Sequence, residues 1–458
     1  MKKGSSRGII AAMVAVAAFA IFLGWFLTYV FESERPEVSL SPRPQYLSGD
    51  KSFVVSASDA KRGIKRILVT VTQDSRTFKV IEQDFPFEGL ANRHGTRKTD
   101  SAFKINPGTM HLADGQIDLN VRVWDHSRRK GGDGNMTVAS HKMIVDTTPP
   151  SIRPVSRLHY INEGGTGLVI YRTSPDTAQS GVFAGDLFFP GHPAGDGFSP
   201  GHMVCFFAVP VGFEPGAGIY LWAKDKAGNS ARASFNNSIR ARQFPVKSLN
   251  ITDRFIERIL GDFPRLEVSG EDSLLDKFLK INREIRTEND GTCREFGTDT
   301  VADRLWEGSF IRMRNAATMA GFGDRRIYLH DGVEVDRQIH LGVDLASLAN
   351  SEIQAANHGR VVFADRLGIY GLTVILDHGQ GISSLYAHLS SIETAAGRYV
   401  KRGDVIGYSG QTGLAGGDHL HFSMMVNGVF VNPVEFWDEH WIRDNIEGKL
   451  ALIRPAGG

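Results

Sequence analysis

An uncharged apolar run near the N-terminus constrains this chain more than any other feature. Residues 8–31 read GIIAAMVAVAAFAIFLGWFLTYVF and contain no Asp, Glu, Lys or Arg. At about 1.5 Å per residue, a helix of this length crosses a hydrocarbon core of ~30 Å. We therefore predict a transmembrane helix over residues 8–31, in contact with the lipid bilayer.

The flanks of the apolar run predict its orientation. Basic residues precede it and acidic residues follow it: Lys2, Lys3 and Arg7 before, Glu32 and Glu34 after. The positive-inside bias places the N-terminus in the cytoplasm and the bulk of the chain outside, in the periplasm or facing the cell wall. The alternative is a cleaved signal peptide, whose apolar region usually spans only ~7–15 residues. We expect an uncleaved, single-pass protein of the cell (inner) membrane.

Charge and cysteine content narrow the classes of function. The formal net charge of the 458 residues is +1, which gives no basic excess for binding nucleic acid. Cys205 and Cys293 are too few for a disulfide scaffold or a Cys-rich zinc site, and their spacing does not decide whether they pair. Any metal site must therefore use His and carboxylates.

Two stretches after residue 35 have the alternating pattern of β-strands. The first contains FVVSAS (53–58) and the second contains GLVIYR (167–172). VDTTPPSI joined to a later W-x-x-D-x-x-G-N resembles bacterial immunoglobulin-like modules, so we expect two β-sandwiches. Neither module shows a His or carboxylate cluster at ligand spacing, which favours a spacer or a binding module.

The next segment changes to helical periodicity. Apolar residues recur at i, i+3, i+4 and i+7 in ITDRFIERIL and EDSLLDKFLKINREI. Thr252 and Ser273 are candidate N-cap or first-turn residues. We predict a helical connector whose apolar stripe is a packing surface.

Histidines of the C-terminal part fall into spaced pairs. IHLGVDLAS places His340 and Asp344 four residues apart, and GDHLHFSMMV places His419 and His421 two residues apart. On a strand, an even spacing puts both side chains on one face. Between these pairs, SSLYAHLS adds His388 on a third predicted strand.

The chemistry of Zn²⁺ suits this set of side chains. Zinc accepts imidazole nitrogen and carboxylate oxygen in tetrahedral geometry, and a catalytic site keeps one position for water. Two His and one Asp make three protein ligands and leave two His for proton transfer and transition-state stabilisation. The HExxH and G-x-S-x-G motifs are absent.

The motifs also occur in the order of a known family. Residues 310–436 resemble the lysostaphin/LytM-type M23 metallopeptidase domain, a family of peptidoglycan endopeptidases, through GFGDRR, HLGVD, NHGRVVFAD, YGLTVILDHG, LYAHLS, VKRGDVIGYSGQTG, GGDHLHF and NGVFVNPVEF. The resemblance implies one Zn²⁺ held by three residues and two catalytic histidines: His340, Asp344 and His421 as ligands, His388 and His419 as catalytic residues. It does not say which histidine is the general base. The remaining histidines of the domain match no motif position, so we expect surface or loop residues: His330, His358, His378 and His440.

The expected fold class is mainly β, with one transmembrane helix, two immunoglobulin-like β-sandwich modules, a helical connector and an antiparallel β-sheet peptidase domain. The expected domains follow the chain in this order: 1–7 cytoplasmic N-terminus, 8–31 transmembrane helix, 36–147 first β module, 148–245 second β module, 246–300 connector, 301–445 peptidase domain and 446–458 C-terminal tail.

The predicted function is a membrane-anchored zinc metalloendopeptidase that hydrolyses peptide cross-links of peptidoglycan, and the resemblance implies a D,D-endopeptidase. The alternative is a non-catalytic cell-wall binding protein or an activator of other peptidoglycan hydrolases. Degenerate relatives of that kind lack one or more zinc ligands, and the intact set of five residues speaks against it. The sequence leaves open the cross-link cleaved, an unidentified regulatory protein, inhibition by the N-terminal modules and the oligomeric state.

Overall fold

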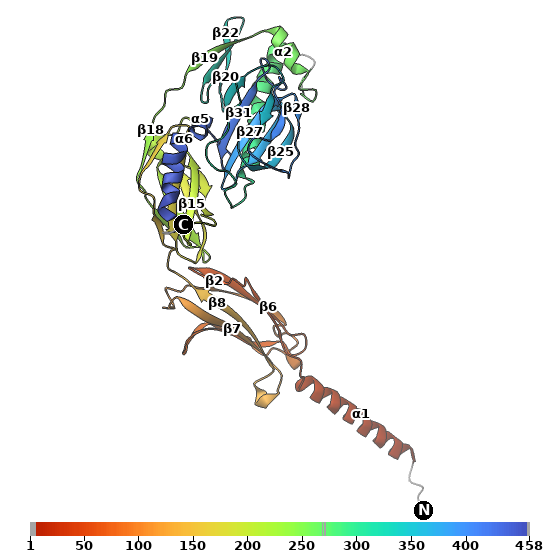
Figure 1. The fold of residues 1–458 in the computed structure, drawn as a ribbon. Helices are drawn as coiled ribbons and strands as arrows, with labels where there is room; N and C mark the ends of the chain where they lie inside the picture. The colour runs from red at the N-terminus through yellow and green to blue at the C-terminus, as the bar shows by residue number, and fades with distance from the viewer. Residues whose placement is uncertain (1–5, 268, 270–271, 456–458) are drawn as a thin grey trace, which may run out of the picture. The chain divides into compact units, whose positions relative to one another are not determined.

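A computed structural model describes residues 6–267, 269 and 272–455 of the chain (Figure 1). Strands hold 42% of the residues and helices 19%, which confirms the mainly β class. The chain divides into two compact units. Unit 1 comprises Met1–Pro149 and Lys226–Asn229, and unit 2 comprises Pro150–Asp225 and Ser230–Gly458.

Helix α1 (Ser6–Val30) begins unit 1. Its residues Gly8–Val30 form a helix that is long and apolar enough to cross a membrane, and none of the apolar window is buried. A membrane anchor and a signal sequence both have this length and composition.

Two sheets follow α1 in unit 1. The first sheet has the strand order β1-β3-β6 and the second β2-β8-β7-β4-β5; every pairing is antiparallel except that of β2 with β8. The strands are β1 (Glu37–Ser41), β2 (Tyr46–Leu47), β3 (Lys51–Ser58), β4 (Ile64–Gln73), β5 (Arg76–Asp84), β6 (Lys98–Ile105), β7 (Gly115–Asp125) and β8 (Met136–Val145), with short 3-10 turns η1 (Leu90–Asn92) and η2 (Lys130–Gly132). Alternate residues of β3 and β7, such as Phe53, Val55, Leu119 and Val121, point into one shared hydrophobic core.

Unit 2 begins with two four-stranded sheets and a parallel pair of strands. Their orders are β14-β15-β11-β9, β13-β12-β16-β17 and β10-β18. The strands are β9 (Ile152–Pro154), β10 (His159–Asn162), β11 (Thr166–Thr173), β12 (Thr177–Ala184), β13 (Leu187–Pro190), β14 (His192–Pro193), β15 (His202–Ala208), β16 (Ile219–Asp225), β17 (Ser230–Ala233) and β18 (Asn237–Arg240), with a 3-10 turn η3 (Pro215–Ala217).

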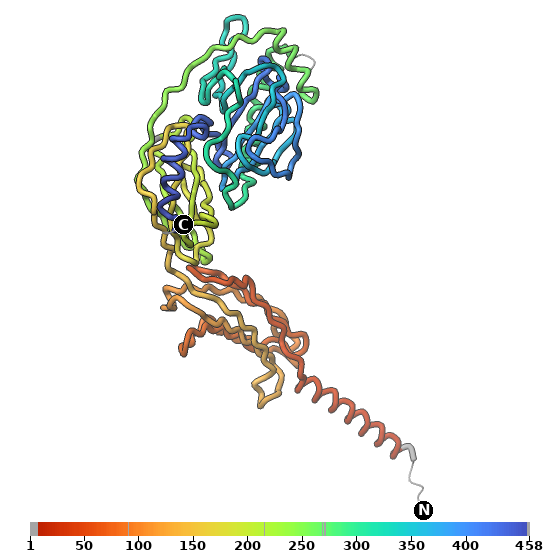
Figure 2. The backbone as a smooth tube through the Cα atoms, in the orientation of Figure 1, coloured from red at the N-terminus to blue at the C-terminus, as the bar shows by residue number. Residues whose placement is uncertain are grey.

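The C-terminal helices return to these sheets and pack against strand β11 (Figure 2). They are α5 (Pro433–Trp437), α6 (Glu439–Ile442), η6 (Arg443–Glu447), α7 (Gly448–Leu450) and η7 (Ala451–Ile453). Lys449 Nζ donates to the Leu168 carbonyl over 3.0 Å. Successive strand residues point to opposite faces, so the burial of Leu168, Val169, Ile170 and Tyr171 in a row means that both faces of β11 are covered.

The connector segment contains both strand and helix. Its first residues form β19 (Val246–Ile251), which pairs in parallel with β21 (Arg325–His330) beside β22 (Val333–Ile339). The helices then follow as α2 (Asp253–Leu260), α3 (Leu274–Lys280), the π-helical turn η4 (Ile281–Ile285) and α4 (Arg286–Thr298). Thr252 caps α2 by accepting from the Phe255 amide, and Ser273 caps α3 in a capping box with Asp276, as predicted.

An eight-stranded antiparallel sheet forms the centre of the C-terminal part. Its order is β20-β23-β31-β27-β26-β25-β29, and β32 pairs with β31. The same part of the chain also forms a separate three-stranded sheet with the order β24-β30-β28. The strands are β20 (Ala317–Ala320), β23 (Val343–Ala346), β24 (Glu352–Gln354), β25 (Gly359–Leu367), β26 (Gly371–Asp377), β27 (Ile382–Leu389), β28 (Ser391–Ile392), β29 (Tyr399–Val400), β30 (Val405–Tyr408), β31 (Leu420–Val426) and β32 (Val429–Val431), with a 3-10 turn η5 (Gly368–Tyr370). Its central strands β23, β31 and β27 carry or adjoin every predicted site residue.

Candidate active site

Adjacent strands bring the two predicted motifs together. Asp344 on β23 lies directly opposite His421 on β31, and His421 lies opposite Ala387 of β27. His340 lies in the short connection between β22 and β23, and His419 immediately precedes β31. The HxH spacing therefore puts both imidazoles on one face of β31, as the strand period requires.

Three ligand atoms converge at the centre of this face. His340 Nε2 and His421 Nδ1 each lie 2.9 Å from Asp344 Oδ1, and the two nitrogens are 3.0 Å apart. Donors held about 2.0 Å from one tetrahedral ion are roughly 3.3 Å from one another, so the cluster is close to the size of a zinc site. The side chains of His340, Asp344 and His421 are all buried.

Hydrogen bonds on the far side of each ring orient the lone pairs towards the cluster. His340 Nδ1 lies 2.8 Å from the Gly321 carbonyl, which only accepts, so Nδ1 carries the proton and Nε2 a lone pair. Ser423 Oγ donates to the Leu341 carbonyl and therefore accepts from His421 Nε2. Consequently His421 Nδ1 also carries a lone pair. Two nitrogen lone pairs and a carboxylate face one another, which is the donor set that a divalent zinc ion fits.

The two remaining histidines border the same cleft. His388 Nδ1 donates to the Thr412 carbonyl and His419 Nδ1 to the Gly417 carbonyl, each over 2.8 Å, so both Nε2 atoms are free to accept a proton. The two rings have centroids 4.8 Å apart. The structure thus brings all five predicted residues together.

Backbone strain positions His388. Its φ angle is +62°, an uncommon left-handed conformation for a residue that is not glycine. It lies where the register between β26 and β27 shifts, in the stretch between Tyr386 and Leu389. Such a bulge re-aims a side chain, and here it turns His388 towards the rings of His419 and His421.

Burial and neighbouring charges shift the pKa of Asp344 in opposite directions. Burial alone would raise the pKa of Asp344, but His340, His419 and His421, in their protonated forms, lower that pKa well below its usual range through charge and hydrogen bonds. Arg326 Nη2 also binds the second carboxylate oxygen, Asp344 Oδ2, at 2.7 Å. The carboxylate is therefore ionised and held in one orientation, as a metal ligand needs to be.

The histidine pKa values respond to the same surroundings. Burial lowers the pKa of His421 to about 4 and the pKa of His388 well below its usual range, and neighbouring imidazoles add to the shift of His388. For His419, burial lowers the pKa, but the hydrogen bond and charge of Asp344 outweigh it and raise the pKa above its ordinary value.

A small cleft of about 90 Å³ surrounds these side chains. Its walls come from three separate segments of unit 2. Arg286 belongs to helix α4, Tyr370 and Ile369 to the turn η5, and Leu414 and Gly416 to the loop before β31. The connector helices hold this wall, because Asn289 Oδ1 accepts from the Ile369 amide and Arg258 Nη2 donates to the Ala415 carbonyl.

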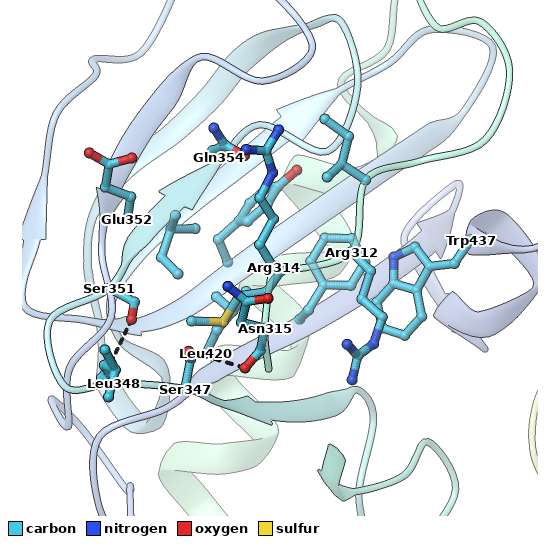
Figure 3. Close-up of a pocket in the computed structure, with 15 residues that line it drawn as sticks. Arg312, Arg314, Asn315, Ser347, Leu348, Ser351, Glu352, Gln354, Leu420 and Trp437 are labelled. Atoms are coloured by element: carbon cyan, nitrogen blue, oxygen red, sulfur yellow. Dashed lines mark hydrogen bonds between the residues drawn. The ribbon is translucent and has the colours of Figure 1, made fainter. Parts of the chain in front are cut away.

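A second pocket lies on the opposite face of β31. It measures about 270 Å³ and is bordered by Arg312, Arg314, Leu420 and Trp437 (Figure 3). Leu420 alternates along the strand with His419 and His421, so its side chain points away from the cleft. None of the five predicted site residues lines this pocket.

Some parts of the site have weak or no sequence signal. Arg326 and Tyr370 lie inside the strings GFGDRR and YGLTVILDHG but have no spacing that marks them, and Ser423 continues the HxH alternation on the same strand face. Arg286 comes from the connector, which the sequence indicated only as a packing surface.

The structure also shows the surroundings of His378 and the state of the two cysteines. His378 lies in the turn after β26 but is fully buried, with Nδ1 bonded to the His358 carbonyl and Nε2 to Ser384 Oγ. His378 is thus a loop residue, one of the two expected alternatives, but it does not lie at the surface: this turn folds into the core, and burial lowers the pKa of His378 to about 4. Cys205 and Cys293 are both free and buried.

Comparison with known proteins identifies the domain that holds the cleft. Residues 338–433 match the model of Peptidase family M23. The chain contains an M23 peptidase domain. The matched range includes His340, Asp344, His388, His419 and His421.

Several curated proteins are similar to this M23 domain. The DD-carboxypeptidase/endopeptidase Mpg of Neisseria meningitidis serogroup B is 41% identical over 97 residues, which are 21% of this chain and 22% of that protein. The peptidoglycan DD-endopeptidase ShyA of Vibrio cholerae is 35% identical over 96 residues, 21% of this chain and 22% of that protein. The murein hydrolase activator EnvC of Escherichia coli is 36% identical over 92 residues, 20% of this chain and 22% of that protein.

The similarity to these relatives is thus confined to the M23 domain. The chain spans about a fifth of the length of the curated relatives it matches. Relatives of the domain include proteins named as endopeptidases and one named as an activator.

Proposed function

We propose that this protein is a membrane-anchored zinc metalloendopeptidase that cleaves peptide cross-links of peptidoglycan. The observation that carries the proposal is the convergence of two imidazole lone pairs and one ionised carboxylate within 3.0 Å of one another. The names of the relatives Mpg and ShyA support the substrate class.

His340, Asp344 and His421 hold one zinc ion in this proposal. Bound there, zinc supplies a Lewis acid that polarises a peptide carbonyl and lowers the pKa of a water molecule. Gly321, Ser423 and Arg326 keep the ligand atoms aimed at that point through the hydrogen bonds described above.

His388 and His419 carry the proton steps in this proposal. Each has its Nδ1 fixed by a backbone carbonyl, which leaves Nε2 directed into the cleft. One Nε2 accepts a proton from the attacking water, and the other, when protonated, donates a hydrogen bond to the oxyanion that develops on the peptide carbonyl.

Residues 8–31 form the membrane anchor in this proposal, with the bulk of the chain outside the cytoplasm. An enzyme on a bilayer meets peptidoglycan at the membrane surface. A helix of this length and composition supports the anchor, and the basic flank supports the orientation.

The ligand assignment predicts which variants lose zinc. His340→Ala, Asp344→Ala and His421→Ala each remove one donor, so we expect zinc content and cleavage of cross-linked muropeptides to fall together. Zinc is measured by elemental analysis of the full chain in detergent, and cleavage by mass spectrometry. His440→Ala, at an exposed position of helix α6, is the matched control and should keep both. An Asp344→Ala protein with stoichiometric zinc and full turnover would contradict the assignment.

The catalytic assignment predicts a different result for the other two histidines. His388→Ala and His419→Ala leave all three ligands, so we expect normal zinc content with a rate about 10²–10⁴-fold lower. A protein related in function to EnvC would behave otherwise, since binding a partner hydrolase needs a surface and no proton acceptor. If the wild type cleaves no cross-link, and both variants still stimulate another hydrolase, the activator is the correct function.

A further inference from the structure

A second group of possible ligands lies in unit 1, far along the chain from the M23 domain. The carboxylates of Glu32, Asp59 and Asp125 place one oxygen each within 4.8 Å of one another. No sequence signal marks this group, because its members are 27 and 66 residues apart and come from the end of a helix and from strands of two different sheets. Glu32 follows α1, Asp59 follows β3 and Asp125 ends β7.

All three carboxylates are buried without a salt bridge; Lys61, which pairs with Glu34, acts on Glu32 and Asp59 only through its charge. Their exposed fractions are 5%, 5% and 0% for Glu32, Asp59 and Asp125. In the described part of the chain, no Lys, Arg or His nitrogen lies within 4.0 Å of them. The nearby Arg62 directs its guanidinium to the rings of Tyr29 and Phe87 instead. Buried like charges are strongly unfavourable unless a cation or a proton balances them.

Glu32 is the member that most clearly lacks a partner. Both of its carboxylate oxygens are inaccessible to solvent and have no hydrogen-bond partner among the described residues. Burial, followed by the charges of Asp59 and Asp125, raises the pKa of Glu32 to about 7. A buried carboxylate that faces two others and has no hydrogen-bond partner is typical of a cation ligand.

Asp59 and Asp125 are held in place in advance. Asp59 Oδ1 accepts from the amides of Arg62 and Gly63, at 2.7 and 2.6 Å. Asp125 Oδ1 accepts from the amides of Ser127 and Asn135, at 2.9 and 2.7 Å. Backbone bonds therefore fix one oxygen of each aspartate. The second oxygen of Asp125, Oδ2, also accepts from Asn135 Nδ2 at 2.7 Å, so little ordering remains to be done when an ion binds.

The donor set indicates which ion the site takes. It contains three carboxylates and no nitrogen or sulfur ligand, which disfavours zinc. Calcium binds six to eight oxygens in flexible geometry with carboxylates in one- or two-oxygen contact, whereas magnesium requires a near-ideal octahedron and keeps several waters. A buried, irregular group of three carboxylates is closer to a calcium site.

We propose that Glu32, Asp59 and Asp125 form a calcium-binding site that fastens the segment after helix α1 to the two sheets of unit 1. Protein hydrogen bonds already hold this segment, since Ser127 Oγ and Asn135 Nδ2 donate to the Glu32 carbonyl and Arg129 Nε donates to the Phe31 carbonyl. Calcium adds a link from the Glu32 side chain to β3 and to β7. The proposal is independent of the proposed peptidase activity.

Calcium binding by the full chain tests this proposal. The protein is purified in detergent, stripped of divalent ions on a chelating resin and titrated with radioactive CaCl₂ by equilibrium dialysis up to about 10 mM, above the range of extracellular calcium modules. We expect one calcium ion per wild-type chain and at least tenfold weaker binding by Glu32→Gln and Asp59→Asn. Glu34→Gln, which makes the same change two residues on at an exposed position, should bind as wild type does.

Hydrogen exchange supplies a second measurement that does not depend on a variant. Calcium should slow amide exchange in residues 31–36, 59–63 and 125–135 of the wild type and of Glu34→Gln, but leave Glu32→Gln unchanged. A wild type that binds no calcium at 10 mM overturns the proposal and leaves a proton shared by Glu32 and Asp125 as the balancing charge. Equal calcium binding by wild type and Glu32→Gln, or preference for MgCl₂ at equal concentration, overturns it as well.

Discussion

His421 on β31 and His378 in the turn after β26 are both buried imidazoles. Each bonds through Nε2 to a serine hydroxyl, at 3.0 Å to Ser423 and 2.7 Å to Ser384. The difference between them lies at Nδ1. In His378 that atom bonds to the His358 carbonyl, so both ring nitrogens are used within the core. In His421 it faces Asp344 and His340, which leaves a lone pair for an ion.

This difference predicts the outcome of two matched substitutions. Ser423→Ala removes the acceptor that fixes the His421 tautomer, so we expect zinc affinity to fall about 10–100-fold. Ser384→Ala removes the hydroxyl that donates to His378 Nε2, a nitrogen outside the cluster, and should leave zinc affinity unchanged. Each substitution also leaves a buried ring nitrogen without its hydrogen-bond partner, an N–H in His421 and a lone pair in His378, at a cost to stability of about 1–3 kcal/mol. Competition with a chromogenic chelator gives the affinity and thermal unfolding gives the stability.

An equal loss of zinc affinity in both variants would show that the effect comes from general loosening of the sheet. Ser384 and Ser423 lie on the neighbouring strands β27 and β31, so such loosening would reach both positions.

At the residue scale, short motifs were enough to find the side chains of the cleft. All five predicted residues line it, while their roles as ligands and catalysts stay predictions. The partners that orient them were beyond the sequence for a physical reason. Gly321, Thr412 and Gly417 act through backbone carbonyls, and a carbonyl has no residue signature.

At the scale of elements, helix α5 joins the end of the M23 domain to strand β11 through one buried carboxylate. Glu435 accepts from the Thr166 amide at 2.8 Å and from Asn162 Nδ2 at 3.2 Å. Burial raises the pKa of Glu435 from 4.5 to about 7, because its two neutral donors compensate only part of the lost solvation.

This raised pKa predicts a pH-dependent stability. The folded state holds the Glu435 proton more tightly than the unfolded state, so the stabilisation is full below pH 4.5 and is lost as the pH rises to about 7. Glu435→Gln cannot titrate. Relative to wild type, it should therefore gain about 2–3 kcal/mol in the free energy of unfolding between pH 5 and pH 8.

Denaturant unfolding of both proteins at the two pH values measures this difference, and any constant effect of the substitution cancels. Glu439→Gln, at an exposed position of helix α6, is the control and should show no such change. A wild-type to Glu435→Gln difference that stays constant from pH 5 to pH 8 would contradict a raised pKa in the folded state.

Local sequence signals predict the helices of the connector but not strand β19 at its start. Thr252 and Ser273 were recognisable as caps because capping depends on residues three positions apart. Strand β19 was not predicted from the sequence, because it pairs with β21, and only the fold brings residues 246–251 next to residues 325–330. The C-terminal helices were not predicted either, because the apolar residues of η6 and α7 are buried against β11, a strand that is distant in the sequence.

At the scale of the whole molecule, the order of segments was readable and the long-range pairings were not. The apolar run, the β-rich middle and the M23 motifs follow one another in the sequence with distinct compositions. The carboxylates of Glu32, Asp59 and Asp125 lie after helix α1, after strand β3 and at the end of strand β7, and no periodicity connects them. A grouping of this kind becomes visible only when strand register is known.

The last prediction concerns the membrane. Because residues 8–31 exceed the usual apolar length of a signal peptide, we expect the mature protein to retain its N-terminus and to stay in the membrane fraction after alkaline extraction. Intact-mass spectrometry of the purified protein decides whether it is cleaved, and a mature form that begins near residue 21 would contradict an anchor. Orientation is measured with alkaline phosphatase fused after Gly458, which should be active outside the cytoplasm. Replacing Lys2, Lys3 and Arg7 by Gln removes the basic flank and should lower that activity, since these charges hold the N-terminus inside.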